Sequence, residues 1–297
     1  MTALIGIDWG TTSFRAWRMG SGGEVLDSVT DGPGILAAGA LPGGFAQALQ
    51  DRLGGWLDGA PIIASGMIAS RNGWVETPYL PLPLDAGALA NSLTLHDGIH
   101  FVTGAVSDPD GPSPDVMRGE ETEIIGHLAG GGGDGLFVLP GTHSKWARTE
   151  GGTLVSFRTV MTGEVFGALR DHTILGRLIQ AGPASPEPGR DDAFRRGVEA
   201  GRQDGALLGR IFSARTLALM DRLSPGHIAD YLSGLLIGDE VAHGAQDAAG
   251  PVTIIGRGDL AARYQTAFAV LGRAADIAPP GMAQRGLWDI ARLRGLA

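Results

Sequence analysis

The first residues that could do chemistry lie in a turn that directly follows a short apolar run near the N-terminus. Residues 4–7 are apolar, and Asp8, Gly10 and the three consecutive hydroxyl residues 11–13 come next. A glycine turn alone would need Gly10, but it would not need three hydroxyls in a row. Turns of this composition expose several backbone N–H groups on one side and so form a concave surface that accepts an anion. The pattern therefore favours a phosphate-binding turn, and an ordinary glycine hairpin is the alternative.

The same design returns about 130 positions further along the chain. Residues 10–13 read GTTS and residues 141–144 read GTHS, and each group lies between an apolar run and a second strand pattern. Asp8 corresponds to Leu139 in the second copy, so only the first copy carries a carboxylate. Two such turns facing each other across a cleft would hold a polyphosphate chain from both ends, and Asp8 would accept a water of a Mg²⁺ shell. Internal similarity of this kind predicts two related domains.

A third glycine-rich turn, GRGDLA at residues 256–261, follows another apolar run. It matches the dinucleotide pattern Gly-x-Gly-x-x-Gly/Ala, but too little chain follows it to complete a dinucleotide-binding fold. Gly256 and Gly258 would instead let an adenosine approach the backbone beside the two phosphate turns. The alternative is a simple helix N-terminus with Asp259 as its cap.

The elements that must position these turns are short strands followed by helices. Residues 4–7, 14–19 and 24–29 read as a β-hairpin and a third strand, with GSGG as one of the connections. Residues 45–57 carry apolar side chains at helical spacing, and the chain is mostly helical in pattern from TGEVFGAL onward. The opening unit is therefore a strand meander with helices packed on it.

The best linker candidate is GGGGDG at residues 130–135, because a glycine-rich run without apolar residues behaves as a flexible connection. We therefore predict two α/β domains, each opening on a mixed sheet with an antiparallel meander. Their expected boundaries are residues 1–130 for the first domain and 135–297 for the second.

The composition indicates a globular protein and excludes several kinds of site. The 297 residues are 43% hydrophobic and 19% charged, the net charge is −9, and there is no cysteine. Disulfides, zinc–thiolate sites and cysteine nucleophiles are thus excluded, and an acidic chain without a lysine–arginine run argues against nucleic-acid and anionic-membrane partners. No signal peptide is visible, and no apolar run approaches the ~20 residues of a spanning helix, so a cytoplasmic protein is expected. A homodimer is compatible with the sequence.

Seven stretches, in this order, make the chain resemble the 2-dehydro-3-deoxygalactonokinases. They are IDWGTTSFRAW, SGMIASRNGWVETPY, MRGEETEIIG, LPGTHSKW, TGEVFGAL, YLSGLLIGDE and IIGRGDLAARY. The resemblance covers nearly the whole chain, and LPGTHSKW and the SGMIASRNGWVE block are specific to the family. The family looks like a branch of the sugar kinase, actin and heat-shock ATPase superfamily. That resemblance implies two ribonuclease-H-like, actin- or hexokinase-type domains with mixed sheets around an interdomain cleft.

The resemblance also implies a reaction, in which the γ-phosphoryl of Mg-ATP passes to the terminal hydroxyl of 2-dehydro-3-deoxy-D-galactonate. ATP would bind mainly to the C-terminal domain and the sugar acid to the N-terminal domain, with Asp8 holding the Mg²⁺. His143 would donate to a phosphate oxygen or simply cap its turn, and Lys145 would neutralise phosphate charge or be an exposed strand residue. The residues expected to bind the cofactor are Gly10, Thr11, Thr12, Gly141, Thr142, His143, Ser144, Lys145, Gly256 and Gly258.

The sugar acid carries a carboxylate, whose natural partner is a planar guanidinium that gives two parallel hydrogen bonds. Arg71 is the first choice because its loop also holds residues that could bind sugar hydroxyls, and its alternative is a surface arginine. The residues expected to contact the sugar acid are Arg15, Ser65, Arg71, Asn72, Trp74 and Arg118.

Phosphoryl transfer also needs a base for the attacking hydroxyl. In related sugar kinases a Gly-Asp pair opening a helix supplies it, and the matching pair here is Gly119-Glu120, with Glu121 next to it. The expected catalytic residues are therefore Glu120, Glu121 and Asp8, with Glu120 ahead of Glu121. The alternative is that these acidic residues only stabilise the first helical turn, by about 0.3–1 kcal/mol.

Other functions stay open beside this one. A kinase for another 2-keto-3-deoxy sugar acid, such as the gluconate epimer, would use the same motifs. A phosphohydrolase on the same scaffold would be expected to line its channel with basic residues, and a non-catalytic sugar sensor to lose Asp8 or the acidic pair.

Overall fold

Short apolar runs separated by glycine turns form mixed sheets in this protein, and helices cover the sheets. The computed structural model describes residues 2–179, 189–203, 205–246 and 248–297. It divides the chain into two compact units. The first comprises Met1–Asp134, Ala147–Arg158 and Pro279–Ala297, and the second comprises Gly135–Trp146 and Thr159–Ala278.

The first unit is built on a six-stranded sheet with the order β3-β2-β1-β4-β7-β6. Strands β1, β2 and β3 form an antiparallel meander, β4 and β7 continue the sheet parallel to β1, and β6 is antiparallel to β7. The strands are β1 Leu4–Trp9, β2 Phe14–Met19, β3 Val25–Val29, β4 Ile62–Ser65, β6 Thr94–His96 and β7 Ile99–Phe101.

Strand β1 is buried on both faces of this sheet, which is why its sequence reads as a continuous apolar run. Ile5 and Ile7 belong to a core that they share with residues of α1 (Ile35–Ala38) and α2 (Gly44–Leu53). On the other face, Gly6 lies against Leu287 of the C-terminal helix α11 (Met282–Arg294). The sheet is therefore enclosed between helices from opposite ends of the chain.

The first unit also holds a three-stranded sheet with the order β5-β8-β9. Helix α4 packs closely on α11, and glycines at the contact allow it: a Cβ added to Gly126 would lie 1.9 Å from the carbonyl oxygen of Met282. The remaining elements of this unit are η1 Gly54–Trp56, η2 Met67–Ala69, β5 Tyr79–Pro81, α3 Ala86–Asn91, β8 Gly104–Ser107, β9 Asp115–Met117 and α4 Glu120–Ala129.

The second sheet has the order β12-β11-β10-β13-β14. Strands β13 and β14 follow β10 in parallel, and the two residues Gly151 and Gly152 join β11 to β12. The strands are β10 Leu136–Leu139, β11 Ser144–Glu150, β12 Thr153–Val160, β13 Val252–Ile254 and β14 Ala275–Ile277.

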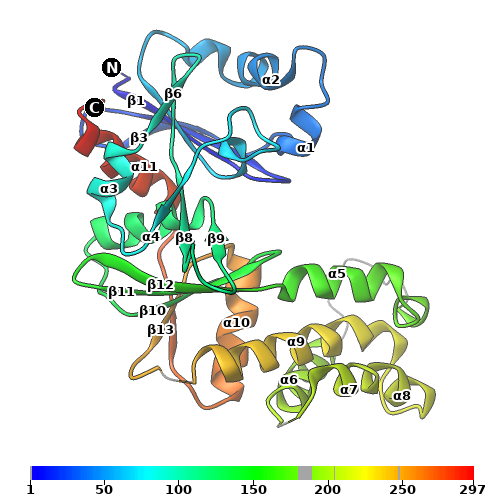
Figure 1. Ribbon diagram of the computed structural model, residues 1–297. Coiled ribbons are helices and arrows are strands. Elements are labelled where there is room, and N and C mark those ends of the chain that lie inside the picture. The colour runs from blue at the N-terminus through cyan, green and yellow to red at the C-terminus, as the bar shows by residue number, and fades with distance from the viewer. Residues whose placement is uncertain (1, 180–188, 204, 247) are drawn as a thin grey trace. The chain divides into compact units, whose positions relative to one another are not determined.

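The helices of the second unit include a layer in which α6, α7 and α8 pack along the long helix α9 (Figure 1). Helix α9 is apolar almost all round, and most of its residues are buried. The helices are α5 Thr162–His172, η3 Gly176–Leu178, α6 Arg190–Gly201, α7 Leu207–Ile211, α8 Ser213–Leu219, η4 Pro225–His227, α9 Ile228–Gly244 and α10 Gly258–Val270.

The two larger sheets repeat one plan. In each, three consecutive strands lie side by side, the first of them pairs in parallel with a fourth, and a fifth follows in parallel beyond it. The internal repeat predicted from the two glycine turns is thereby confirmed at the level of strand order. The first sheet differs by the added edge strand β6.

The compact units differ in two places from the boundaries expected from sequence. Residues 147–158 and 279–297 are grouped with the first unit, although they follow the glycine linker in the chain. The assignment of the units as a sugar-binding and an ATP-binding domain stays a prediction. None of the helices in the described ranges is long and apolar enough to cross a membrane.

Candidate functional site

The first glycine turn connects β1 to β2 and presents three exposed hydroxyl residues. The amide of Gly10 donates to the carbonyl of Ser13 at 2.9 Å, and the side chains of Thr11 and Thr12 are exposed. The turn is supported from behind by the start of α1, where the amide of Ile35 donates to the Gly10 carbonyl at 3.0 Å. At Gly34 an added Cβ would lie 2.4 Å from the backbone nitrogen of Thr12, so only glycine permits this contact. The sequence prediction of an open, hydroxyl-rich turn agrees with this geometry.

Asp8 lies at the end of β1, directly before that turn, and forms a cluster with Arg15 and Glu123. Strand pairing places Asp8 opposite Arg15, whose Nε donates to Asp8 Oδ2 at 2.8 Å. The Nη2 of Arg15 contacts the same oxygen and lies 3.3 Å from Glu123 Oε1. Burial, together with the charge of Asp8, raises the pKa of Glu123 to about 7, although Arg15 opposes the shift.

Glu123 is a residue that sequence reasoning missed. It lies three positions after Glu120 in the stretch EETE, and positions i and i+3 share one face of a helix. That spacing was the feature of the sequence that could have pointed to Glu123. The pairing with Arg15 was not visible, because it joins a strand to a helix 108 positions away.

The acidic pair at the start of α4 divides into two different environments. Glu121 is 1% exposed, and its two carboxylate oxygens lie 2.9 and 2.7 Å from the amide of Gly119. Burial and the charge of Glu120 raise the pKa of Glu121 to about 7, against the hydrogen bonds that lower it. Glu120 is only partly buried, and its Oε2 accepts from the backbone amide of Arg118 at 3.1 Å.

The loop after β4 lies beside Asp8. Strand pairing places Ser65 next to Asp8, and the Ser65 side chain is buried. No hydrogen-bond partner reaches its hydroxyl oxygen within the described residues. Gly66 follows with a φ of +92°, and an added Cβ would lie 3.1 Å from Asp8 Oδ1 and 2.9 Å from the Trp9 carbonyl. A buried hydroxyl without a partner costs free energy, so it marks a place where a ligand group would fit.

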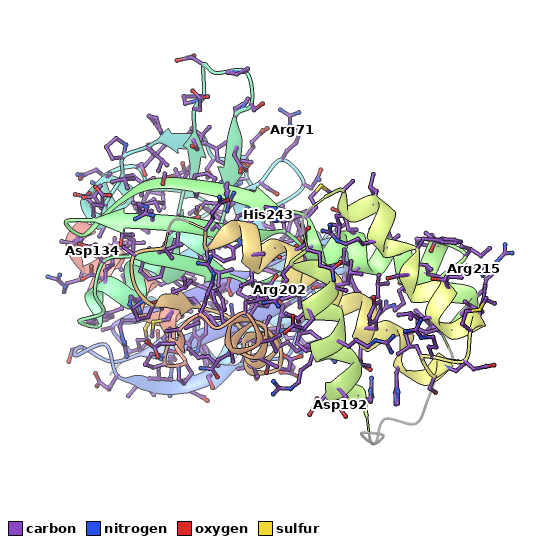
Figure 2. The ribbon with its side chains drawn as sticks, turned by 90° about the horizontal axis from the view of Figure 1, so that it is seen from below. Arg71, Asp134, Asp192, Arg202, Arg215 and His243 are labelled. Carbon is purple, nitrogen blue, oxygen red and sulfur yellow. The ribbon has the colours of Figure 1, made fainter. Side chains whose placement is uncertain are left out.

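The arginines expected at the sugar acid differ in availability. Arg71 is 83% exposed, forms an exposed pair with Glu76 at 3.3 Å, and projects outward from its loop (Figure 2). Arg118 is buried: its Nη2 donates to the Thr77 carbonyl at 2.9 Å, and its guanidinium lies 4.2 Å from the ring centre of Tyr79. Arg15 is shared between two carboxylates, as described above. Among the three, Arg71 is thus the one held most weakly.

Two other residues expected to contact the sugar acid, in the same loop as Arg71, also differ in exposure. Asn72 is exposed, whereas Trp74 is partly buried in an aromatic cluster. Its ring lies 6.2 Å from the rings of both Phe45 and Phe101. Trp74 therefore contributes to the packing that holds this loop.

The second glycine turn is supported in the same way as the first. The amide of Glu164, in the first turn of α5, donates to the Thr142 carbonyl at 2.9 Å. At Gly163 an added Cβ would lie 2.3 Å from the Gly141 carbonyl, so glycine again permits a helix start to rest on a turn. His143 pairs with Glu164, with 2.5 Å between Nε2 and Oε2.

Lys145 follows this turn and is buried. Its Nζ donates to the Thr159 hydroxyl at 2.7 Å. The alternative of an exposed strand residue is therefore wrong, because the side chain crosses to the neighbouring strand β12.

A cavity of about 320 Å³ lies in the second unit beside this turn. Buried Asp230 accepts from Arg190 at 2.8 Å and from Arg263 at 2.6 Å, so two of the lining arginines are held by one carboxylate. The residues that line the cavity are Gly141, Thr162, Gly163, Phe166, Arg170, Arg190, Ala229, Asp230, Ser233, Leu236, Ile237, Arg257, Asp259, Leu260, Arg263 and Tyr264. Sequence reasoning missed most of this set, since it comes from α5, α6, α9 and α10, which no single motif spans.

The third glycine turn contributes to the cavity through Arg257 and Asp259. Helix α10 begins at Gly258, and its N-cap is Arg257. Asp259 is therefore the second residue of the helix and not its cap, which corrects the alternative considered from sequence. Gly256 and Gly258 flank the lining residue Arg257.

The described residues contain no group of three or more His, Cys, Asp or Glu side chains that could hold a metal ion. A Mg²⁺ ion bound with a nucleotide needs only one or two carboxylates, because phosphate and water oxygens complete its shell. The single carboxylate of Asp8, beside an open hydroxyl-rich turn, fits that requirement.

Solved structures first define the class of protein. The activator of the 2-hydroxyisocaproyl-CoA dehydratase from Clostridium difficile with bound ADPNP matches with a TM-score of 0.54, 10% identity and coverage of 99% of this chain and 96% of that one. Component A of the (R)-2-hydroxyglutaryl-CoA dehydratase from Acidaminococcus fermentans also has a TM-score of 0.54, at 11% identity and coverage of 99% and 98%. At this identity they show the fold alone. That fold is a mixed α/β fold with several mixed sheets.

Closer relatives then give the particular family. The family model described as 2-keto-3-deoxy-galactonokinase matches residues 8–290. The 2-dehydro-3-deoxygalactonokinase of Escherichia coli K12 is 36% identical over 279 residues, which cover 92% of this chain and 91% of that protein. The crystal structure of a Sinorhizobium meliloti protein assigned to the same activity has a TM-score of 0.84, 32% identity and coverage of 97% and 98%. The chain belongs to the 2-keto-3-deoxy-galactonokinase family.

Proposed function

We propose that this kinase transfers the γ-phosphoryl group of ATP to the terminal hydroxyl of 2-dehydro-3-deoxy-D-galactonate and forms the 6-phosphate. The observation that carries the proposal is the family match over residues 8–290, which includes both glycine turns and the acidic start of α4. The fold adds support, because both turns are backed by helix starts in a way that keeps their exposed sides open.

The nucleotide binds in the second unit, with its adenosine in the cavity that Tyr264, Phe166 and Arg257 help to line. Its phosphates extend to Gly141 and Thr142, and the prediction that Gly10, Thr11 and Thr12 also bind phosphate is kept. Four arginines and two aspartates line the cavity, so its wall keeps an excess of positive charge even with Arg170 paired to Asp171, and this favours an anionic ligand.

Catalysis here is mostly positioning and charge neutralisation. The proton of the sugar hydroxyl moves to the carboxylate of Glu120 as the hydroxyl oxygen bonds to the γ-phosphorus, and the bond from that phosphorus to the β-bridging oxygen breaks. Glu120 is preferred to Glu121 because both carboxylate oxygens of Glu121 are already engaged by the Gly119 amide. A Mg²⁺ ion held through Asp8 would neutralise charge on the phosphates.

The sugar acid binds in the first unit near Asp8. Ser65 offers it the buried hydroxyl that has no partner within the described residues. Arg71 supplies the guanidinium for its carboxylate, since the exposed pair with Glu76 contributes little and can be exchanged. Arg15 holds Asp8 in place, and Arg118 holds the loop that contains Thr77.

The test is ADP formation by the purified protein with and without 2-dehydro-3-deoxy-D-galactonate. We expect ADP formation to depend on the sugar acid and to fall about 100-fold or more in an Asp8→Asn variant, because the Mg²⁺ ion that would neutralise the phosphate charge then loses its carboxylate. The variant also controls for contaminating kinases, which it would leave unaffected. Wild-type protein that forms no ADP with this compound would contradict the proposal.

A panel of other 2-keto-3-deoxy sugar acids, including the gluconate epimer, separates the two kinase alternatives. The phosphohydrolase alternative predicts equal ADP release with and without a sugar acid, and would be supported by that result.

A further inference from the structure

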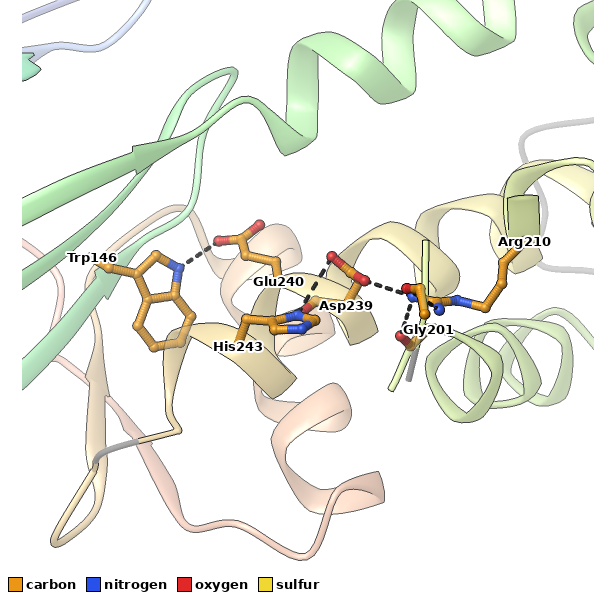
Figure 3. A network of polar contacts seen from close by, with 7 residues as sticks. Trp146, Gly201, Arg210, Asp239, Glu240 and His243 are labelled. Atoms are coloured by element: carbon orange, nitrogen blue, oxygen red, sulfur yellow. Dashed lines mark hydrogen bonds and ion pairs between the residues drawn. The ribbon is translucent and has the colours of Figure 1, made fainter. Parts of the chain in front are cut away.

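A buried hydrogen-bonded network lies directly behind the second glycine turn. Its centre is Glu240, a residue of α9 that is 4% exposed. The Glu240 carboxylate accepts from Trp146 Nε1 at 2.8 Å (Figure 3) and from the Tyr264 hydroxyl at 2.6 Å. The hydroxyls of Ser144 and Thr162 are further hydrogen-bond partners of the same carboxylate.

The members of this network lead to the proposed nucleotide site from several directions. Ser144 is the last residue of the glycine turn and begins β11, and its hydroxyl lies 2.9 Å from that of Tyr264. Thr162, the first residue of α5, and Tyr264, in α10, both line the cavity, as does Gly141. Glu240 itself does not line it. One buried carboxylate thus ties together β11, α5, α9 and α10.

Such a carboxylate is costly to keep inside a protein. Burial raises the pKa of Glu240 even though the hydrogen bonds from Thr162 and Tyr264 lower it. Replacing buried polar groups by well-packed apolar ones is often neutral or stabilising, so stability alone does not explain the network. Its geometry explains it better, because every direct partner except Trp146 either belongs to the glycine turn or lines the cavity.

We propose that Glu240 is a positioning residue for the nucleotide. It fixes the hydroxyls of Ser144, Thr162 and Tyr264, and so holds the glycine turn and the cavity wall in the arrangement that accepts ATP. Glu240 does not touch the nucleotide and acts only through these residues. The role rests on the proposed function, in which ATP binds beside Gly141.

The neighbouring residue Asp239 offers a matched control. It lies on the same helix, but its Oδ1 accepts from Arg210 at 2.7 Å, and it faces away from Trp146 (Figure 3). Asp239 is absent from the lining of the cavity. Its replacement removes a carboxylate and an ion pair from α9 and leaves the Glu240 network in place.

The experiment compares Glu240→Ala, Glu240→Gln and Asp239→Ala with the wild type. Binding of a fluorescent ATP analogue and the KM values for ATP and for the sugar acid are measured. Losing the acceptor of several hydrogen bonds should raise the KM for ATP and the dissociation constant of the analogue about tenfold or more. The KM for the sugar acid should stay within about twofold, and the amide oxygen of Glu240→Gln should restore part of the affinity. Asp239→Ala should bind the analogue as the wild type does, even where it is less stable.

The outcomes separate this role from the proposed function. If the wild type, Glu240→Gln and Glu240→Ala all bind the analogue equally well, Glu240 has no positioning role. Equal weakening by Glu240→Ala and Asp239→Ala would also overturn it, because the effect would then be a general loss of stability. A wild-type protein that binds no ATP analogue would overturn the proposed nucleotide site itself, and with it this role.

Discussion

At the scale of single residues, the same amino acid serves different purposes at neighbouring positions. Glu120, Glu121 and Glu123 come from one short stretch, EETE. Glu121 turns inward and caps its own helix, Glu123 turns to Arg15, and Glu120 stays partly exposed. Helical geometry turns Glu121 about 100° away from Glu120, whereas Glu120 and Glu123 share one face and differ because Glu123 contacts Arg15.

The inward carboxyl of Glu121 should make stability depend on pH. Its pKa is about 7 in the folded protein against an ordinary value of 4.5, so the folded state binds the proton more tightly than the unfolded state. The stability this proton gives is complete below about pH 4.5 and is lost as the pH rises through about 7. A Glu121→Gln variant has no carboxyl to ionise at this position, so it does not lose this stability as the pH rises. Between pH 4.5 and pH 8 its free energy of unfolding should therefore rise relative to wild type, by on the order of 3 kcal/mol at most.

Urea unfolding of both proteins at several pH values in that range measures the effect. The exposed Glu199→Gln variant controls for removing a carboxylate at the surface. A difference between Glu121→Gln and wild type that does not change with pH would show that the Glu121 carboxyl ionises without cost.

At the scale of elements, glycine lets the backbones of packed elements touch. Gly34 and Gly163 let helix starts rest on the two turns, and Gly126 and Gly286 let α4 and α11 cross closely. The glycines of α6 and α9 serve the same purpose: a Cβ on Gly197 would lie 2.2 Å from the Tyr231 carbonyl. The high glycine content of the chain is therefore partly structural, although an isolated glycine in a sequence does not indicate such a contact.

Alanine at two helical glycines should have effects of opposite sign. In Gly286→Ala the new Cβ would lie 1.9 Å from the Thr122 carbonyl, so α4 and α11 must separate, at a cost of roughly 1–3 kcal/mol or more. In Gly167→Ala, within α5, the new Cβ meets nothing within 4 Å, and the higher helix propensity of alanine should stabilise by about 1 kcal/mol. Thermal unfolding of the two variants measures the signs. Destabilisation by both, to the same extent, would contradict the close crossing of α4 and α11.

At the scale of the whole molecule, each compact unit is built from segments that are not contiguous in the chain. The first unit takes back residues 279–297, whose helix α11 buries Met282, Leu287 and Ile290 against its core. A unit assembled from both ends of a chain cannot be complete until the last residues are in place.

A chain that ends at residue 278 should therefore lose the fold of its first unit. Burying three large apolar side chains contributes roughly 5–9 kcal/mol, which is comparable to the total stability of a typical domain, about 5–15 kcal/mol. Limited proteolysis should then cleave rapidly within residues 2–134, whereas a chain lacking only residues 296 and 297 should resist as the full chain does. Equal protection of the first unit in both chains would show that α11 is dispensable.

The sequence alone determined the local features of this protein. These features are the strand–turn–strand units, the repeat of the glycine turns and the start of α4 at Glu120. Each depends only on neighbouring residues, so apolar runs and glycine spacing were enough to predict it. The family resemblance added the proposed reaction, and the family match confirmed that the chain belongs to the family.

Only the tertiary structure decided which distant groups meet. Strand pairing and helix packing joined Arg15 to Glu123, Lys145 to Thr159 and Glu240 to Trp146. The same packing took Glu121 and Arg118 out of solvent and left Arg71 outside. Contacts of this kind depend on how whole elements lie on one another, and nothing in the spacing of residues along one segment carries that information.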